Sequence, residues 1–186
     1  MWHQLDEVLR MSPENVLEIG PGPGVFKAIA KTLGVNVETL DLDPELEPDY
    51  LDSVLDMPFE DNHFDVVCAF QMLEHLPYEK SLEAFKEMSR IARIGVVISL
   101  PDAKRVWPVF FNFPKLGRVP IPLFNLRLGL KKHVFDGEHY WEINKKNYSL
   151  KKVINDFSVS GWMLNHTFLV TENPYHRFFI YTSDHS

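Results

Sequence analysis

The chain has 186 residues, of which 26 are acidic and 19 basic, so its formal net charge is −7. This length predicts one domain with a single sizeable core, and ordinary shares of apolar (45%) and charged (24%) residues exclude a disordered or fibrous protein. The negative net charge argues against non-specific nucleic-acid binding, which needs a basic surface.

The cysteine content and the distribution of apolar residues exclude further classes of protein. The single cysteine, Cys68, excludes a disulfide framework and a thiolate-only zinc site. The first residues lack the basic start and apolar run of a secretory signal, and no stretch of about 18 apolar residues is present. We therefore expect a soluble, cytoplasmic protein.

The first hundred residues alternate between short apolar runs and helical patterns. Helix-forming residues predict a helix over 25–33, ended by Gly34, and apolar residues at helical spacing predict an amphipathic helix over 78–92. Such alternation predicts an α/β fold with a parallel sheet and helices on both faces. The apolar runs that predict buried strands lie at residues 15–19, 35–40, 64–70 and 95–100.

The middle of the chain differs in composition. Residues 1–102 carry 20 acidic and 7 basic side chains, whereas residues 103–150 carry 3 and 9. Proline and aromatic residues are concentrated in the same basic region, which predicts an insertion at about 102–137. After it, residues 149–157 predict a helix, and two further strands are expected to form a C-terminal antiparallel hairpin. These strands lie at residues 162–170 and 177–182.

The first predicted strand runs into a glycine-rich turn, residues 18–24 (Glu-Ile-Gly-Pro-Gly-Pro-Gly). Three alternating glycines let the backbone approach a ligand closely. The helix that follows points its N-terminal amides into the same crevice, beyond the carboxyl ends of the strands. A dinucleotide-binding turn would place its third glycine where Val25 stands, and Glu18 would repel a pyrophosphate. The turn therefore predicts a ligand without phosphates, preferably a cationic one.

Residues 16–24 resemble the first motif of class I S-adenosylmethionine-dependent methyltransferases, specifically the small-molecule group called type 11. The resemblance covers residues 15–100 well and 137–182 more loosely. It implies a Rossmann-like methyltransferase fold, with one methyltransferase domain over residues 1–186. Three further segments match the family in register: residues 40–44 (Leu-Asp-Leu-Asp-Pro), 55–65 (Leu-Asp-Met-Pro-Phe-Glu-Asp-Asn-His-Phe-Asp) and 70–76 (Phe-Gln-Met-Leu-Glu-His-Leu).

The resemblance implies S-adenosylmethionine as the cofactor and assigns its contacts. Asp41 would accept both ribose hydroxyls, Asp56 would accept the adenine amine, and the Met57 amide would donate to a ring nitrogen. Glu18 would order the amides or waters near the ammonium group. The alternative for these carboxylates is an ordinary role in turns or as a solvated helix cap. The residues expected at the cofactor are Glu18, Gly20, Pro21, Gly22, Gly24, Asp41, Leu42, Asp56, Met57 and Gln71.

Two histidines are candidate catalytic residues, each with a structural alternative. His75 either faces the methyl donor or caps the helix after Pro77. His139, in residues 138–141 (Glu-His-Tyr-Trp), is either a proton acceptor over the substrate or an anchoring core residue. The remaining histidines show no metal-ligand spacing, so no metal is expected. Cys68, in the middle of a strand, is expected to be a small buried filler.

The resemblance also limits the methyl acceptor. Methyl transfer from a sulfonium is a direct displacement, so the protein mainly aligns the reactants and excludes water. Residues 71–74 (Gln-Met-Leu-Glu) differ from the Asn/Asp-Pro-Pro-aromatic turn of enzymes that methylate nucleobase or glutamine nitrogens. The predicted acceptor is a small or lipid-like molecule, with no nucleic-acid partner. Two alternatives stay open: a non-catalytic relative that binds the cofactor as a regulatory module, and another Rossmann-like enzyme such as a nicotinamide dehydrogenase.

The insertion at 102–137 is too long for a mere connection in a compact domain. Sheet topology would place it over the cofactor crevice. We hypothesise a lid whose aromatic residues line an apolar acceptor pocket and whose basic residues recognise an anionic acceptor group or a membrane surface. The alternative is a satellite core with a charged outer face. The residues concerned are Trp107, Phe110, Phe111, Phe113 and Phe124, with Lys104, Arg105, Lys115, Arg118, Arg127, Lys131 and Lys132.

Two segments depart from the family pattern. The turn at 92–95, before the fifth strand of the family fold, is compressed, so we expect the end of the preceding helix to be distorted. The segment before the first strand is short, so the N-terminal helix around Leu5, Val8 and Leu9 is expected to have only one or two turns.

Overall fold

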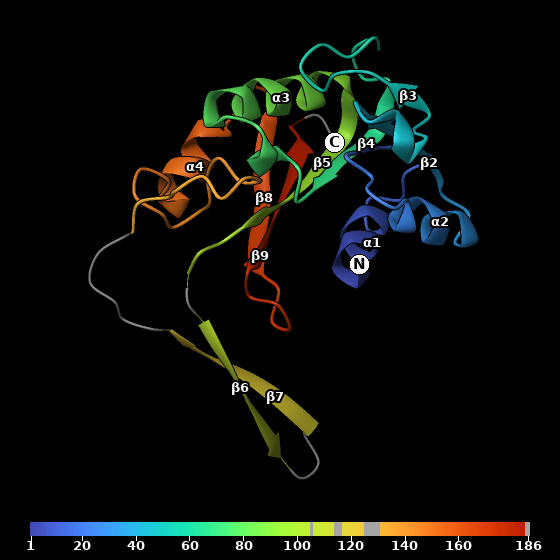
Figure 1. Ribbon diagram of the computed structural model, residues 1–186. Coiled ribbons are helices and arrows are strands. Elements are labelled where there is room, and N and C mark those ends of the chain that lie inside the picture. The colour runs from blue at the N-terminus through green and yellow to red at the C-terminus, as the bar shows by residue number, and fades with distance from the viewer. Residues whose placement is uncertain (105, 114–116, 125–130, 185–186) are drawn as a thin grey trace.

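The computed structural model describes residues 1–104, 106–113, 117–124 and 131–184, with side chains for all of these except 106–124 (Figure 1). The strands of its main sheet are β1 (Asn15–Ile19), β2 (Asn36–Asp41), β3 (Tyr50–Leu51), β4 (Phe64–Phe70), β5 (Ala92–Pro101), β8 (Trp162–Leu169) and β9 (His176–Ser183). The helices are α1 (Trp2–Leu9), α2 (Val25–Thr32), α3 (Tyr78–Ile91) and α4 (Leu150–Asp156), with short 3-10 helices η1 (Pro44–Leu46) and η2 (Leu73–His75).

The main sheet has the strand order β3-β2-β1-β4-β5-β9-β8. Strands β1 to β5 pair in parallel, and β9 runs antiparallel to both of its neighbours. The predicted α/β sheet with a C-terminal antiparallel hairpin is therefore confirmed. Strand β3 was not predicted, because an edge strand of two residues is too short to show an apolar pattern.

Side-chain alternation along the strands divides the core into two layers. Val66 and Cys68 of β4 pack with α1 and α2, whereas Val67 and Ala69 pack with α3 and α4. This follows from the period of two in a strand, and Figure 1 shows the helices on the two sides of the sheet. Cys68 is fully buried, which confirms the prediction that it fills the core.

The compressed turn before β5 leaves the helix end regular. Helix α3 ends at Ile91 and β5 begins at Ala92, with no loop between them. The irregularity falls instead in the β4–β5 ladder, where the register shifts between Phe64 and Val66. The prediction of a distorted helix end is therefore wrong, because the strand pairing absorbs the missing residues.

The N-terminal helix α1 spans eight residues, in agreement with the predicted one or two turns, and buries Leu5 and Val8. Among the described residues, none of the helices is both long and apolar enough to traverse a bilayer.

The insertion contains a separate two-stranded sheet, β6 (Val106–Phe113) and β7 (Gly117–Phe124), which stands apart from the main sheet in Figure 1. Prolines face each other in this ribbon, with Pro108 opposite Pro122. A ribbon consists only of edge strands, where proline is tolerated, and this is why the composition did not predict strands. The aromatic and most of the basic side chains of the hypothesised lid lie outside the described residues, so the lid stays a prediction.

Candidate functional site

The strand order of the main sheet reverses between β1 and β4, and ligands of open α/β sheets bind in the crevice at such switch points. The Gly20 amide donates to the Leu40 carbonyl at the end of β2 (3.0 Å). A Cβ on Gly20 would lie 2.6 Å from Met72 Cγ, in the segment after β4. The turn after β1 is therefore held between the ends of β2 and β4.

The three glycine positions of the turn require glycine for different structural reasons. All have a left-handed backbone, with φ of +68°, +52° and +69° at Gly20, Gly22 and Gly24. Packing against Met72 leaves no room for a side chain at Gly20, whereas a Cβ on Gly22 or Gly24 would meet no atom within 4 Å. The backbone at Gly22 and Gly24 thus borders open space, as a turn that lets a ligand approach closely requires.

Glu18 is a buried carboxyl group directly before this turn. Glu18 is only 4% exposed, and its Oε2 has no hydrogen-bond partner among the described residues. Burial raises the pKa of Glu18 to about 8, although the charge and the backbone amide of Lys27 oppose this rise. An unpaired buried oxygen is costly unless a ligand donates to it. The observed environment fits the predicted cationic ligand.

Asp41 and Leu42 lie at the end of β2, beside the turn. Asp41 is half-buried, and its Oδ1 accepts a hydrogen bond from the Asp43 amide (2.9 Å). Leu42 is 68% exposed. Because the Leu40 carbonyl bonds to the Gly20 amide, the chain brings Asp41 and Leu42 next to the glycine turn. A carboxylate and an apolar side chain at this place fit a ribose and an adenine ring.

The role predicted for the Met57 amide is wrong. This amide donates to Glu87 Oε1 of α3 (3.0 Å), and Met57 is only 3% exposed. Arg90, also on α3, binds the Met57 and Phe59 carbonyls (3.1 and 2.7 Å). Helix α3 thus uses the donor that was assigned to the adenine. Asp56, the neighbouring candidate, is exposed.

Gln71 follows β4 with a left-handed backbone (φ +55°), which is uncommon for a residue other than glycine. Its amide donates to the Ser99 carbonyl (3.0 Å) and its side-chain Nε2 donates to Ser99 Oγ (3.3 Å). Residues in such conformations are concentrated at functional sites. The strained residue lies immediately before Met72, which contacts the glycine turn.

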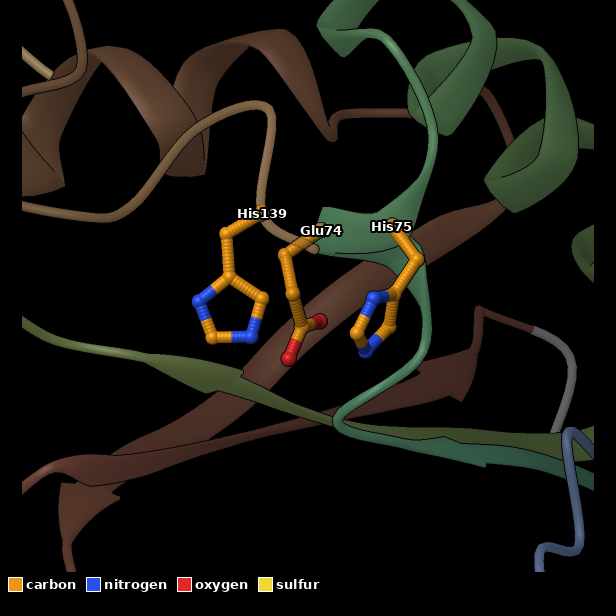
Figure 2. A group of neighbouring side chains, drawn as sticks. All are labelled: Glu74, His75 and His139. Atoms are coloured by element: carbon orange, nitrogen blue, oxygen red, sulfur yellow. The ribbon is translucent and has the colours of Figure 1, made fainter. Parts of the chain in front are cut away.

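The two candidate catalytic histidines lie together (Figure 2). Their ring centroids are 5.1 Å apart. His75 does not cap α3, because the helix begins after Pro77 without a side-chain cap, and His75 Nδ1 bonds instead to the Glu138 carbonyl (3.1 Å). That structural alternative is wrong. His139 is half-buried among polar groups, with Nδ1 3.5 Å from the Tyr175 hydroxyl.

Glu74, between these histidines, was missed as a candidate. It is 0% exposed, and neither carboxyl oxygen has a hydrogen-bond partner among the described residues. Burial, with a smaller contribution from the nearby Glu142 carboxylate, raises the pKa of Glu74 to about 8. Ligand atoms of Glu74, His75 and His139 all lie within 4.8 Å of one another. The only signal in the sequence was a glutamate beside the candidate His75 in the segment after β4.

The fold and the crevice define a class of protein. A sheet that reverses its order beside a glycine-rich turn, with a carboxylate at the end of the neighbouring strand β2, is the arrangement expected from the class I S-adenosylmethionine-dependent methyltransferases. The chain belongs to the methyltransferase-domain family, whose model matches residues 3–147. The predicted membership of this class is confirmed.

Solved structures show the same fold at low sequence identity. An S-adenosylmethionine-dependent methyltransferase from Mesorhizobium loti superposes with a TM-score of 0.65 at 15% identity, covering 97% of this chain and 96% of that chain. The glycopeptide N-methyltransferase MtfA, solved with (S)-adenosyl-L-homocysteine, superposes with a TM-score of 0.63 at 12% identity, covering 97% and 88%.

A relative by sequence is the uncharacterized protein MJ0638 of Methanocaldococcus jannaschii. It is 26% identical over 133 residues, which is 68% of this chain. The match spans only 58% of the relative's length.

Proposed function

We propose that this protein transfers a methyl group from S-adenosylmethionine to a small-molecule or lipid-like acceptor by direct displacement. The observation that carries the proposal is the crevice between β1 and β4. There, open backbone at Gly22 and Gly24 lies beside the unpaired carboxyl oxygen of Glu18 and the half-buried Asp41.

The residues of this crevice match the chemical groups of the cofactor. The open space over Gly22 and Gly24 receives the methionine part, and the unpaired carboxyl oxygen of Glu18 accepts a hydrogen bond from its ammonium group. Asp41 accepts the ribose hydroxyls, and Leu42 covers the adenine. The bound cofactor supplies a methyl group already activated on a sulfonium, so the protein's task is to align the acceptor and exclude water.

The residues exposed next to η2 are the basis for the proposed methyl acceptor. The Tyr140 amide donates to the Glu74 carbonyl of η2 (2.9 Å), and the Phe135 ring packs against Tyr140 with centroids 4.7 Å apart. Exposed Val134, Phe135 and Tyr140 offer apolar area there, and Lys131 and Lys132 are exposed beside them. Apolar and basic groups together suit an anionic, partly apolar acceptor or a membrane surface. We also propose a cytoplasmic location, which is supported by the free thiol of Cys68.

Binding and transfer experiments test the cofactor and the two alternative functions, a nicotinamide dehydrogenase and a non-catalytic relative. Calorimetry with S-adenosylhomocysteine and, separately, with a nicotinamide dinucleotide is expected to show binding of the first ligand alone. Binding of the nicotinamide dinucleotide instead would refute the proposal in favour of a dehydrogenase. Transfer of labelled methyl from S-adenosylmethionine to an extracted metabolite pool then tests catalysis. Cofactor binding without any transfer to the pool would support the non-catalytic alternative.

A separate experiment tests whether the basic residues of the insertion recognise the acceptor or a membrane surface. Replacing Arg118, Arg127, Lys131 and Lys132 with serine is expected to leave S-adenosylhomocysteine affinity unchanged and to abolish binding to phosphatidylserine vesicles or transfer to the metabolite pool. If vesicle binding and transfer both remain at the parent level, the proposed recognition role of these residues is wrong.

A further inference from the structure

Three side chains of residue types that serve as metal ligands lie close together after the end of β4. Glu74 and His75 belong to η2, and His139 comes from the segment after the insertion. The hydrogen bond from the Tyr140 amide to the Glu74 carbonyl holds the two segments together. Figure 2 shows the Glu74 carboxyl group between the two imidazole rings, and the ligand atoms of the three residues lie within 4.8 Å of one another.

Each imidazole has a polar neighbour at its Nδ1 atom. The Glu138 carbonyl can only accept, so His75 Nδ1 carries the proton in their hydrogen bond. His139 Nδ1 lies 3.5 Å from the Tyr175 hydroxyl and 3.8 Å from Glu142 Oε1. Metal-binding histidines commonly donate their second ring nitrogen to a carbonyl or carboxylate, which orients the ring. This pattern would leave Nε2 of each ring to bind a metal.

Glu74 supplies an independent sign that points to a bound cation. The residue has no exposed surface, and both carboxyl oxygens lack a hydrogen-bond partner among the described residues. Among the described residues no basic side chain forms an ion pair with Glu74, and Lys145 pairs with the neighbouring Glu142 (3.4 Å). A buried carboxylate without a partner is strongly unfavourable, and a metal ion between the two histidines would compensate it.

We propose that Glu74, His75 and His139 bind one divalent transition-metal ion, with Zn²⁺ as the test ion. Two imidazole nitrogens and one carboxylate oxygen suit zinc and its neighbours better than Mg²⁺ or Ca²⁺, which prefer oxygen ligands. Three protein ligands leave a coordination position open, as in catalytic rather than structural zinc sites. An acceptor oxygen is the class of ligand that fits this position. Metal binding does not depend on the proposed methyl transfer.

Calorimetry on the untagged, chelator-treated chain tests the site with Zn²⁺, and Co²⁺ absorption reports its coordination. The parent is expected to bind one equivalent of either ion. Glu74→Gln, which keeps the size of the buried side chain, and His139→Gln, on a half-buried residue, are each expected to weaken Zn²⁺ binding more than 10-fold. Tyr175→Phe removes only an outer partner and is expected to weaken it about 10-fold. The control, His166→Gln, changes an exposed histidine that pairs with Glu7 (3.1 Å).

S-adenosylhomocysteine affinity and thermal unfolding are measured on every variant. Unchanged values show that a lost metal affinity is local and not a folding defect. The proposal is overturned if the parent takes up neither ion stoichiometrically, or if Glu74→Gln and His139→Gln both bind Zn²⁺ like the parent. A parent that binds Zn²⁺ but not S-adenosylhomocysteine would refute the proposed function and leave the metal site standing.

Discussion

Replacement of Gly22 with valine distinguishes an effect on ligand binding from an effect on the packing of the protein itself. In the folded protein a Cβ at this position meets no atom within 4 Å, so the substitution creates no internal collision. Its cost to folding is the left-handed backbone at φ +52°, about 1–2 kcal/mol, which corresponds to a fall in Tm of roughly 2–8 °C for a chain of this size. If the cofactor occupies this space, the added side chain is also expected to weaken its binding by about 1–3 kcal/mol, or 5- to 150-fold.

Gly34 offers the matched control. It has a left-handed backbone (φ +82°) and equally open surroundings, but it lies after α2, at the other end of the helix from the turn. Gly34→Val is therefore expected to lose similar stability in thermal unfolding and to keep its full affinity for S-adenosylhomocysteine in calorimetry. Unchanged affinity in folded Gly22→Val, or an equal loss in both variants, would refute the assignment of the glycine turn to the cofactor.

Three further predictions concern single side chains. Asp41→Ala is expected to weaken S-adenosylhomocysteine binding by about 1.5–3 kcal/mol, the value of a hydrogen bond to a charged group; calorimetry showing no change would contradict the ribose contact. Because burial raises the pKa of Glu18 from 4.5 to about 8, the folded state retains a proton that the unfolded chain loses. Between these pH values this residue lowers the free energy of unfolding by about 1.4 kcal/mol per pH unit as pH rises, and urea unfolding of Glu18→Gln should show that slope removed; parallel curves would argue against it. Arg177→Met removes the ion-pair partner of the buried Asp102, whose Oδ2 lies 2.7 Å from Arg177 Nε, and urea unfolding is expected to show a loss of about 3–5 kcal/mol. A loss below 1 kcal/mol would mean that the hydrogen bonds from the Lys104 amide and Asn144 to Asp102 Oδ1 compensate the charge.

The strands and the glycine turn were predictable from sequence because their causes are local. A parallel strand covered on both faces is a short, nearly continuous apolar run, and β4 at Phe64–Phe70 matches its predicted bounds. A turn of alternating glycines directly after such a strand shows where the backbone must adopt positive φ. The α/β class, the family and the location of the crevice all follow from these local patterns.

The partners of polar groups were decided only by the tertiary structure. The Met57 amide is satisfied by Glu87, thirty residues further along the chain, because α3 packs beside that segment. Glu74 and His139 meet because a hydrogen bond joins η2 to the segment after the insertion. Hydrogen bonds and ion pairs form between whatever groups packing brings within about 3 Å, and no spacing along the sequence encodes that distance. The sequence alone therefore determined the fold class, the core strands and the position of the glycine turn, and packing determined which side chains are left for a ligand.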